Sequence, residues 1–427
     1  MIWALLEALR RRKIQSQSFL SRASFPENQS ATTITGLKIR YLDSWLMDEA
    51  ASRELFVHGS QLADLSLIEG TLCPQEIASD GRGSQLETLC QWLRLPRIIL
   101  LDASRISGPL PRRPAEVDGV LLDMVADDRH LARLTTDVQT VWRVPVLGSL
   151  PAGAKFSEKI NRLPPGVEPT SDFYRELGDH LTRSWQPELL CRISQAQPIE
   201  PFEEKLFRTE TSPLRLTVAV AFDEAFNRYF PCEMDMIEAR GATIVDFSPL
   251  YDEHLPECDI VLLGGGHPER YSSMLADNHC MKTALRNHIR WGRRIYGEGG
   301  GLAPLCQQMI GPDGQHARMA GLLPAVARPL QPESEPVPVE TTLARPNWLG
   351  HAGVKIRGYR NQCWALEPSG RLTGFLSDDE HHFGMMGSFH AIGSLLEVHF
   401  GTQSNLLNHF FYPHMPTPPD VDPWQSC

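Results

Sequence analysis

The segments CDIVLLGGGHPE (258–269) and RRIYGEGGGLAPLC (293–306) decide the fold. Each is an apolar run that ends in a cluster of glycines, and the pattern over 293–309 predicts a strand, a tight turn and a helix. That order is typical of a nucleophile elbow, in which a turn presents one side chain above a parallel sheet. The glycines alone leave open a plain tight connection between strand and helix.

Further apolar runs rich in Ile, Val and Leu predict parallel strands of an α/β fold, with helical patterns between them. A polar, proline-containing stretch separates two such regions, which predicts domains at 1–185 and 214–412, a linker at 186–213 and a loose proline-rich tail at 413–427. The strands are expected in 63–70, 96–103, 117–125, 144–151, 215–223 and 242–249, and the helices at 84–95, near 172–194, and at 232–240, 281–292 and 402–411.

The composition disfavours several classes of function. The 427 residues carry a formal net charge of −11, which argues against binding nucleic acid through its phosphates. No apolar run is long enough to span a membrane. The nine cysteines are scattered without a CxxC pair, so we expect neither a disulfide framework nor a zinc ribbon, and we expect a reducing cytoplasm as the setting.

The segment AFDEAFNRYFPCEMDMIEARGATIVDFSPLYDEHLPECDIVLLGGGHPE (221–269), taken together with the glycine-rich segment after it, carries a specific resemblance. It resembles the C-terminal glutamine amidotransferase domain of the cobyrinic acid a,c-diamide synthases. The resemblance implies a flavodoxin-like class I glutamine amidotransferase fold. It also implies that Gly264, Gly265 and Gly266 form the oxyanion-hole turn.

The departures from the family pattern fall on the residues that do the chemistry. Gly299 stands at the position of the nucleophilic cysteine, Glu397 at that of the catalytic histidine, and His399 matches a second histidine. RGYRNQ (357–362) replaces R-G-H-E-F-H, a segment that the family associates with substrate handling. Because glutaminase chemistry needs a thiolate to attack the amide carbon, we expect no glutamine hydrolysis.

Two points about these positions follow from geometry. Cys306 cannot replace the missing thiol, because it would lie roughly 10 Å along the following helix at about 1.5 Å per residue. Glycine adopts freely the backbone conformation that a cysteine at an elbow holds under strain. His399, two residues beyond Glu397, either faces the site from a strand or is an ordinary packed histidine.

The N-terminal region resembles the family's P-loop ATPase domain of the dethiobiotin-synthetase type. MIWALLEALRRR (1–12) matches the helix that follows the phosphate-binding loop, which implies a P-loop NTPase-like parallel sheet truncated at its N-terminus. A start codon placed too far downstream is one explanation for the absence of the phosphate-binding loop and of the first strand. The segment 19–43 keeps the framework of the next motif but has Leu20 and Ser24 where the family has a lysine and an aspartate.

The resemblance implies ATP and Mg²⁺ as cofactors. Glu69 matches a strand-end glutamate that looks like a Mg²⁺ ligand, Asp43 persists from the preceding motif, and Asp80 matches a following aspartate. Asp123 replaces an asparagine that would read adenine, and a carboxylate cannot donate a hydrogen bond as an amide does. A carboxylate at the end of a parallel strand also occurs without any function.

The resemblance leaves two functions open. The family reaction is the ATP- and glutamine-dependent amidation of the a and c carboxylates of cobyrinic acid in cobalamin biosynthesis. The alternative is a non-catalytic pseudoenzyme that binds a corrinoid or another tetrapyrrole, or pairs with an active paralogue through the homodimer surface expected for the family. A decaying gene whose product still folds is a third possibility.

Overall fold

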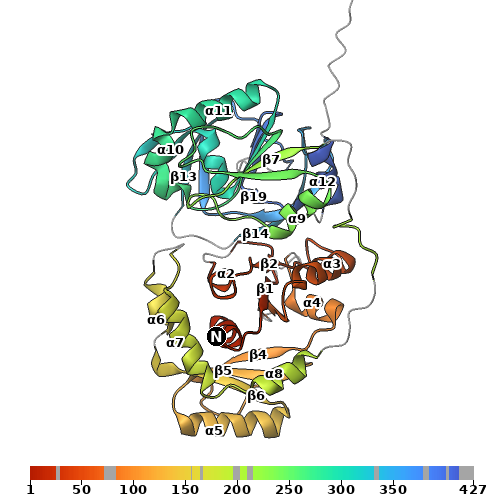
Figure 1. The fold of residues 1–427 in the computed structure, drawn as a ribbon, viewed down its shortest axis with the longest axis vertical. Helices are drawn as coiled ribbons and strands as arrows, with labels where there is room; N and C mark the ends of the chain where they lie inside the picture. The colour runs from red at the N-terminus through yellow and green to blue at the C-terminus, as the bar shows by residue number, and fades with distance from the viewer. Residues whose placement is uncertain are drawn as a thin grey trace, which may run out of the picture. The chain divides into compact units, whose positions relative to one another are not determined.

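The computed structural model describes residues 1–25, 29–71, 83–154, 156–163, 167–195, 202–208, 215–330, 336–377, 384–400 and 403–412. The chain divides into two compact units, Met1–Glu204 and Lys205–Cys427 (Figure 1). Asp80 and the tail 413–427, about which the sequence made predictions, lie outside the described residues. No helix in the described part of the chain is long and apolar enough to cross a membrane.

The first unit contains two three-stranded sheets, and both are parallel. One has the order β2 (Arg40–Tyr41), β1 (Ser16–Leu20), β3 (Leu65–Glu69), and the other has the order β4 (Ile98–Asp102), β5 (Gly119–Val125), β6 (Val146–Pro151). Central β5 is largely buried, whereas Leu100 of outer β4 is 50% exposed. The four strands expected between 63 and 151 are therefore confirmed.

Helices lie between most of these strands, as in an α/β fold, although only a short 3₁₀ turn separates β4 from β5 and three helices follow β6 in the described part of the unit. The helix expected near 172–194 is instead two helices, α7 and α8, and the second begins at Pro187, which suits a first helical turn. Helix α8 occupies the beginning of the stretch expected as a linker. The helices are α1 (Ile2–Arg11), α2 (Ser30–Thr35), α3 (Glu49–Ser60), α4 (Leu86–Leu93), α5 (Asp128–Asp137), α6 (Phe156–Asn161), α7 (Ser171–Thr182) and α8 (Pro187–Ser194).

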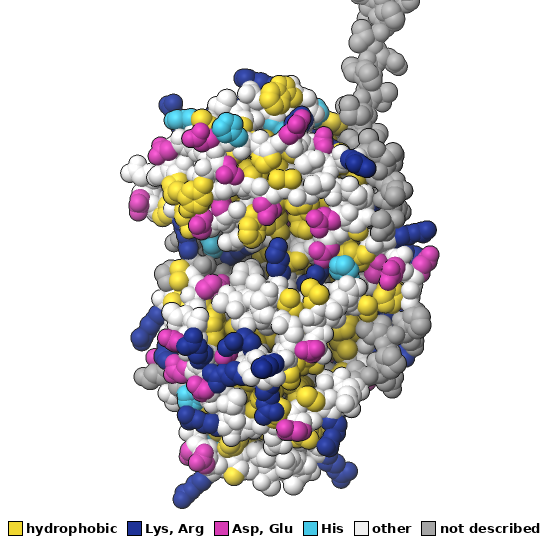
Figure 2. Space-filling view, in the orientation of Figure 1, with side chains coloured by type: hydrophobic (Ala, Val, Ile, Leu, Met, Phe, Trp, Pro, Cys, Tyr) yellow, Lys and Arg dark blue, Asp and Glu magenta, His cyan; other side chains and the backbone are white. Residues whose placement is uncertain are grey.

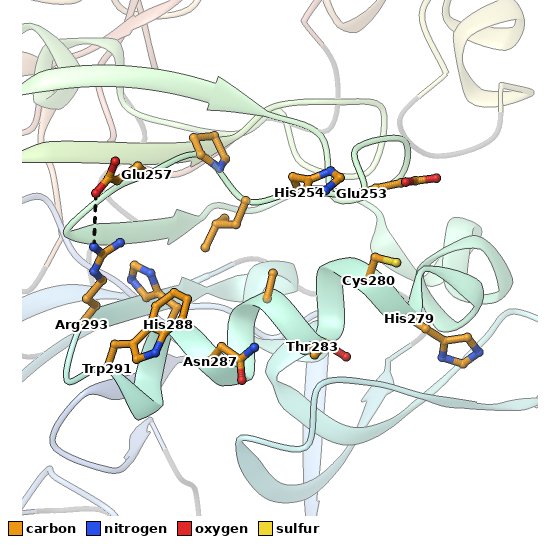
Figure 3. A pocket seen from close by; sticks show the side chains of 13 residues that line it. Glu253, His254, Glu257, His279, Cys280, Thr283, Asn287, His288, Trp291 and Arg293 are labelled. Carbon is orange, nitrogen blue, oxygen red and sulfur yellow. Dashed lines mark ion pairs between the residues drawn. The ribbon is translucent and has the colours of Figure 1, made fainter.

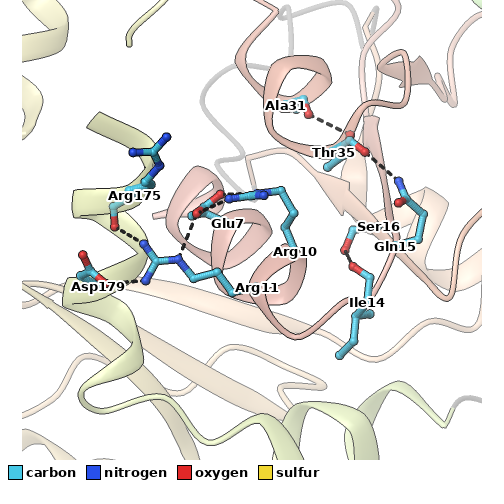
Figure 4. A network of polar contacts seen from close by, with 10 residues as sticks. All are labelled: Glu7, Arg10, Arg11, Ile14, Gln15, Ser16, Ala31, Thr35, Arg175 and Asp179. Carbon is cyan, nitrogen blue, oxygen red and sulfur yellow. Dashed lines mark hydrogen bonds and ion pairs between the residues drawn. The ribbon is translucent and has the colours of Figure 1, made fainter. Parts of the chain in front are cut away.

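A network of charged side chains joins α1 to α7 (Figure 4). Buried Glu7 accepts hydrogen bonds from Arg10 at 2.7 Å and from Arg11 at 3.0 Å. Arg11 also donates to Asp179 and to the carbonyl of Arg175. Burial acts to raise the pKa of Glu7, but the two arginines outweigh it and the pKa is lowered. Figure 2 shows Lys and Arg side chains gathered on one face of this unit.

The second unit is built on a six-stranded sheet of order β17-β18-β10-β9-β7-β8, parallel except for β17. Strand β10 is buried along its whole length, as expected at the centre of a parallel sheet. The strands are β7 (Thr217–Ala221), β8 (Thr243–Phe247), β9 (Ile260–Leu263), β10 (Arg294–Glu298), β17 (Met385–Gly387) and β18 (Ala391–Ser394), and the helices are α9 (Pro231–Ala239), α10 (Ser272–Asp277), α11 (His279–Arg290) and α12 (Ser404–Phe411).

The helix expected at the end of 293–309 is wrong. Gly299–Leu305 forms a short 3₁₀ helix, and Cys306 begins a strand, β11 (Cys306–Ile310). Three glycines and Pro304 explain the difference, because they are poor helix formers. Strand β11 belongs to a sheet of order β12 (His316–Arg318), β11, β13 (Leu323–Pro329), β16 (Trp364–Pro368), and a further sheet has the order β14 (Val337–Thr342), β15 (Lys355–Arg360), β19 (Leu396–Glu397).

Candidate functional site

Three neighbouring parallel strands, β9, β10 and β18, end at the same edge of the six-stranded sheet. Gly264 follows β9, Gly299 follows β10, and Glu397 comes three residues after β18. The carboxyl ends of parallel strands are where α/β folds place their sites. The Cα of Gly265 lies 4.0 Å from the position that a Cβ on Gly299 would occupy, so the two glycine turns meet.

The turn Gly264–Gly266 is held against the segment that precedes α9. The N–H of Gly264 donates to the Oη of Tyr229 at 2.9 Å, and the N–H of Gly265 donates to the carbonyl of Arg228 at 3.2 Å. In the turn predicted to form the oxyanion hole, the N–H groups of Gly264 and Gly265 therefore already donate hydrogen bonds to other residues of the chain.

Gly299 keeps the backbone of an elbow without its side chain. Its φ of +54° lies in the left-handed region, where a residue with a side chain is strained. Apart from its chain neighbours, the atoms within 4 Å of a Cβ placed there are Nδ2 of Asn361, at 3.4 Å, and the Cα of Gly265. Among the described residues, no sulfur atom lies within 4 Å of that position.

Cys306 does not supply the missing thiol. It is fully buried at the start of β11, and its Sγ donates to the carbonyl of Leu302 at 3.6 Å. Burial raises the pKa of this thiol to about 12. A thiol with such a pKa is neutral at physiological pH, whereas the nucleophile in acyl transfer is the thiolate.

Glu397 and Asn361 form the wall opposite Gly299. The Nδ2 of Asn361 donates to the Oε1 of Glu397 at 2.8 Å, and Glu397 is 4% exposed. The antiparallel pairing of β15 with β19 brings these two residues together, because Asn361 directly follows β15. The sequence marked position 397 as a lost histidine, but no pattern marked Asn361, since an amide carries no recognisable motif.

Glu298, the residue before Gly299, adds a second buried carboxyl group. Its Oε2 accepts hydrogen bonds from the Oη of Tyr296 at 2.9 Å and from the N–H of Val398 at 3.1 Å. Burial, and next the charge of Glu397, raise the pKa of Glu298 to about 8. Burial and the charge of Glu298 likewise raise the pKa of Glu233, on α9, well above its usual value. Buried carboxyl groups therefore lie beside Gly299, and that of Glu298, with a pKa of about 8, is mostly protonated at neutral pH.

His399 packs into the core against α9. Its Nε2 lies 3.1 Å from the Sγ of Cys232, and its ring centroid lies 5.1 Å from that of Phe230. Its Nδ1 is 3.8 Å from the Oε1 of Glu233. Burial lowers the pKa of His399 to about 3, so this imidazole is neutral. The placement agrees with the interpretation of His399 as a packed histidine.

Arg228 and His267 are two polar residues beside the turn that the sequence did not single out. The Nη2 of Arg228 lies 2.9 Å from the Nε2 of His267, whose Nδ1 lies 3.1 Å from the Oε1 of Glu269. Because Arg228 can only donate, Nε2 accepts and the ring carries its proton on Nδ1. The pair ties the Gly264–Gly266 turn to the segment before α9.

Known proteins resemble this chain over most of its length. The family described as "CobB/CobQ-like glutamine amidotransferase domain" matches residues 217–362, which include both glycine turns and Asn361. Cobyrinate a,c-diamide synthase of Salmonella typhimurium is 27% identical over 95% of this chain and 93% of its own. The protein of that name from Synechocystis is 29% identical over 95% of this chain and 89% of its own.

Over most of its length, the chain is therefore similar to the cobyrinate a,c-diamide synthases, at 27–29% identity. A solved structure entitled "Crystal structure of glutamine amidotransferase" overlaps 45% of this chain and 96% of its own chain, with 14% identity and a TM-score of 0.35.

In the first unit, the carboxylates expected at a nucleotide site are only partly brought together. Glu69 at the end of β3 and Asp123 in β5 both act electrostatically on the amino group of Met1, so both lie beside the start of α1. Asp43 is fully buried, and its two oxygens accept backbone N–H groups of Ala23 and Trp45, each at 2.9 Å. The described residues contain no group of three or more His, Cys, Asp or Glu able to hold a metal ion.

A cavity of about 850 Å³ lies away from the candidate site. It is bounded by residues 253–257, which precede β9, and by α11, whereas the glycine turn follows β9. Figure 3 shows Cys280, Thr283 and Asn287 along α11 below the loop that carries His254. None of the predicted site residues lines this cavity.

Proposed function

We propose that this chain acts in corrin-ring biosynthesis as a cobyrinate a,c-diamide synthase-like protein whose amidotransferase unit does not hydrolyse glutamine. The observation that carries the proposal is the environment of Gly299. The elbow conformation is kept, but an amide nitrogen lies 3.4 Å from the Cβ position and no sulfur lies within 4 Å in the described structure.

The chemistry explains why these features matter. Glutamine hydrolysis passes through a thioester, which needs a thiolate and a base that receives its proton. Position 299 has no side chain, the thiol of Cys306 is buried and protonated, and the imidazole of His399 is turned toward Cys232. Glu397 could accept a proton, but no nucleophile stands opposite it.

The cofactors implied by the family, ATP and Mg²⁺, do not fit the residues that the structure describes. Asp43 already uses both carboxylate oxygens for backbone N–H groups, as a turn-stabilising aspartate does. Glu69 and Asp123 both lie beside the start of α1, but the described residues contain no group of three or more His, Cys, Asp or Glu that could hold the metal ion. The proposal therefore assigns no step to ATP in this chain.

For the role that remains, we propose binding rather than catalysis: a corrinoid, or an active paralogue of the synthase. The support is that the fold and the turn at φ +54° are present where the reactive groups of the family pattern are missing. Titration of the full chain with a corrinoid, followed by the absorbance of the macrocycle, is expected to saturate. Failure to bind a corrinoid, together with failure to co-purify a paralogous synthase, would contradict this part of the proposal.

The glutaminase claim is tested by incubating the purified full-length chain with L-glutamine and measuring glutamate and ammonia. We expect the release to equal that of Gly299→Ala, a matched control that also lacks a thiol at the turn. Glutamine hydrolysis by the native chain that Gly299→Ala abolishes would overturn the proposal.

A further inference from the structure

Asn361 is fixed at the site by three hydrogen bonds. Its N–H donates to the carbonyl of Leu395 at 2.7 Å, and its Oδ1 accepts the N–H of Cys363 at 2.8 Å. Its Nδ2 donates to the Oε1 of Glu397 at 2.8 Å. Backbone and side chain are therefore both held, and the carboxamide has one preferred position.

That position lies over the empty elbow. Nδ2 of Asn361 is the nearest atom to the Cβ position of Gly299, at 3.4 Å, which is van der Waals contact. Gly299 is buried, whereas Asn361 is only half-buried. The side chain of Asn361 thus lies against the turn, while part of the residue is exposed to solvent.

The group that fills this space has the chemistry of a glutamine side chain. A primary carboxamide offers two N–H donors and one oxygen acceptor, whether it belongs to Asn or to Gln. In the site, the Nδ2 of Asn361 donates to Glu397, which stands at the position of the family's base. The same nitrogen lies beside Gly299, which stands at the position of the family's nucleophile.

We propose that the carboxamide of Asn361 occupies the carboxamide subsite of the amidotransferase unit, as an internal ligand that excludes free glutamine. The inference rests on the proposed function and deepens it: the site has lost its nucleophile and is also filled by its own chain. Removal of the Asn361 amide opens a pocket for a primary carboxamide, floored by Gly299 and walled by Glu397.

A structural role is the competing explanation, in which Asn361 serves only to satisfy the buried carboxylate of Glu397. Two substitutions separate the explanations. Asn361→Ala removes both the volume and the hydrogen bond, whereas Asn361→Leu keeps the branched shape and removes only the hydrogen bond. Occupancy predicts different behaviour for the two variants, and a purely structural hydrogen bond predicts the same behaviour.

The first experiment measures binding of L-glutamine to the full-length chain by calorimetry. We expect Asn361→Ala to bind L-glutamine at least tenfold more tightly than the native chain. The native chain and Asn361→Leu are both expected to show no saturation. Asn287→Ala is the matched control. It deletes the side-chain amide of a residue that lines the separate cavity of Figure 3, and it should behave as the native chain. Equal behaviour of the Ala and Leu variants of Asn361 would overturn the inference.

The second experiment introduces a thiol by Gly299→Cys and measures its alkylation by iodoacetamide with mass spectrometry, after thermal unfolding has shown that the variants fold. We expect Asn361→Ala to speed the reaction about tenfold in that background and Asn361→Leu to leave it slow. A reaction equally fast with and without the Asn361 side chain counts against occupancy. Glutamine hydrolysis by the native chain would instead contradict the proposed function, so the two failures are distinguishable.

Discussion

Gly266 and Gly299 lie at two turns that meet at one sheet edge. Both have positive φ, but they differ in the space available for a side chain. A Cβ on Gly266, at φ +153°, would lie 2.1 Å from the carbonyl oxygen of Ala225. A Cβ on Gly299, at φ +54°, would meet nothing closer than Asn361, at 3.4 Å. The difference indicates that packing requires glycine at 266, whereas the space at 299 would accept a methyl group.

The largest effect is expected for Gly266→Ala. The new methyl group would overlap a backbone oxygen that cannot move independently, in a region of φ that side chains avoid. We expect a loss of about 4 kcal/mol in the free energy of unfolding, measured by urea denaturation. A loss below about 1 kcal/mol would show that the turn adapts, and the contrast with Gly299 would then disappear.

The second prediction concerns the carboxyl group beside Gly299. Because the folded state holds the pKa of Glu298 at about 8, it retains a proton that the unfolded chain releases near its ordinary value of 4.5. The stabilisation is complete below the unfolded pKa and is lost as the pH rises toward 8. We expect Glu298→Gln to remove about 2 kcal/mol of the decline in stability between pH 6.5 and 8.

Two features make the pH measurement specific. The lowered pKa values of His399 and His288, at about 3 and about 4, make stability rise with pH around 6.5, so they cannot cause this decline. Glu233, whose pKa burial raises, adds to the decline, and Glu298→Gln leaves that carboxyl group in place. Glu257→Gln is the matched control, because Glu257 is 93% exposed. An unchanged decline in Glu298→Gln would place the responsible carboxyl group elsewhere.

A smaller effect is expected for Gly299→Ala. The methyl group has space, so the cost is that of placing a side chain at φ +54°, about 1 kcal/mol. Urea denaturation beside Gly266→Ala measures both under the same conditions. If Gly299→Ala proved as damaging as Gly266→Ala, the open position at 299 would not exist in solution.

The smallest effect concerns the cysteines and leaves stability unchanged. Brief alkylation of the native chain should label exposed Cys191 and Cys280 rapidly and leave Cys232, Cys258 and Cys306 unmodified. Burial raises the pKa of Cys258 to about 11 and that of Cys306 to about 12, which also slows them. Labelling of Cys306 at the rate of Cys280 would reveal an accessible thiol near the turn.

Much of the fold was predictable because parallel strands are continuous apolar runs. The runs at 63–70 and 117–125 became β3 and β5, and the run at 258–269 became β9 with its glycine turn. The helix expected after Gly299 was a wrong prediction that the sequence could have avoided, because three glycines and Pro304 are poor helix formers. Cys306 therefore lies in a strand, although the conclusion that it cannot serve the turn is unchanged.

The absence of a side chain at position 299 and the carboxylate at position 397 follow from residue identity alone. Their surroundings depend on how distant segments of the chain pack. Asn361 reaches Gly299 because β15 pairs with β19, and His399 turns to Cys232 because α9 packs there. The physical reason is that side-chain contacts between residues dozens of positions apart depend on strand pairing and packing, which a local pattern does not encode.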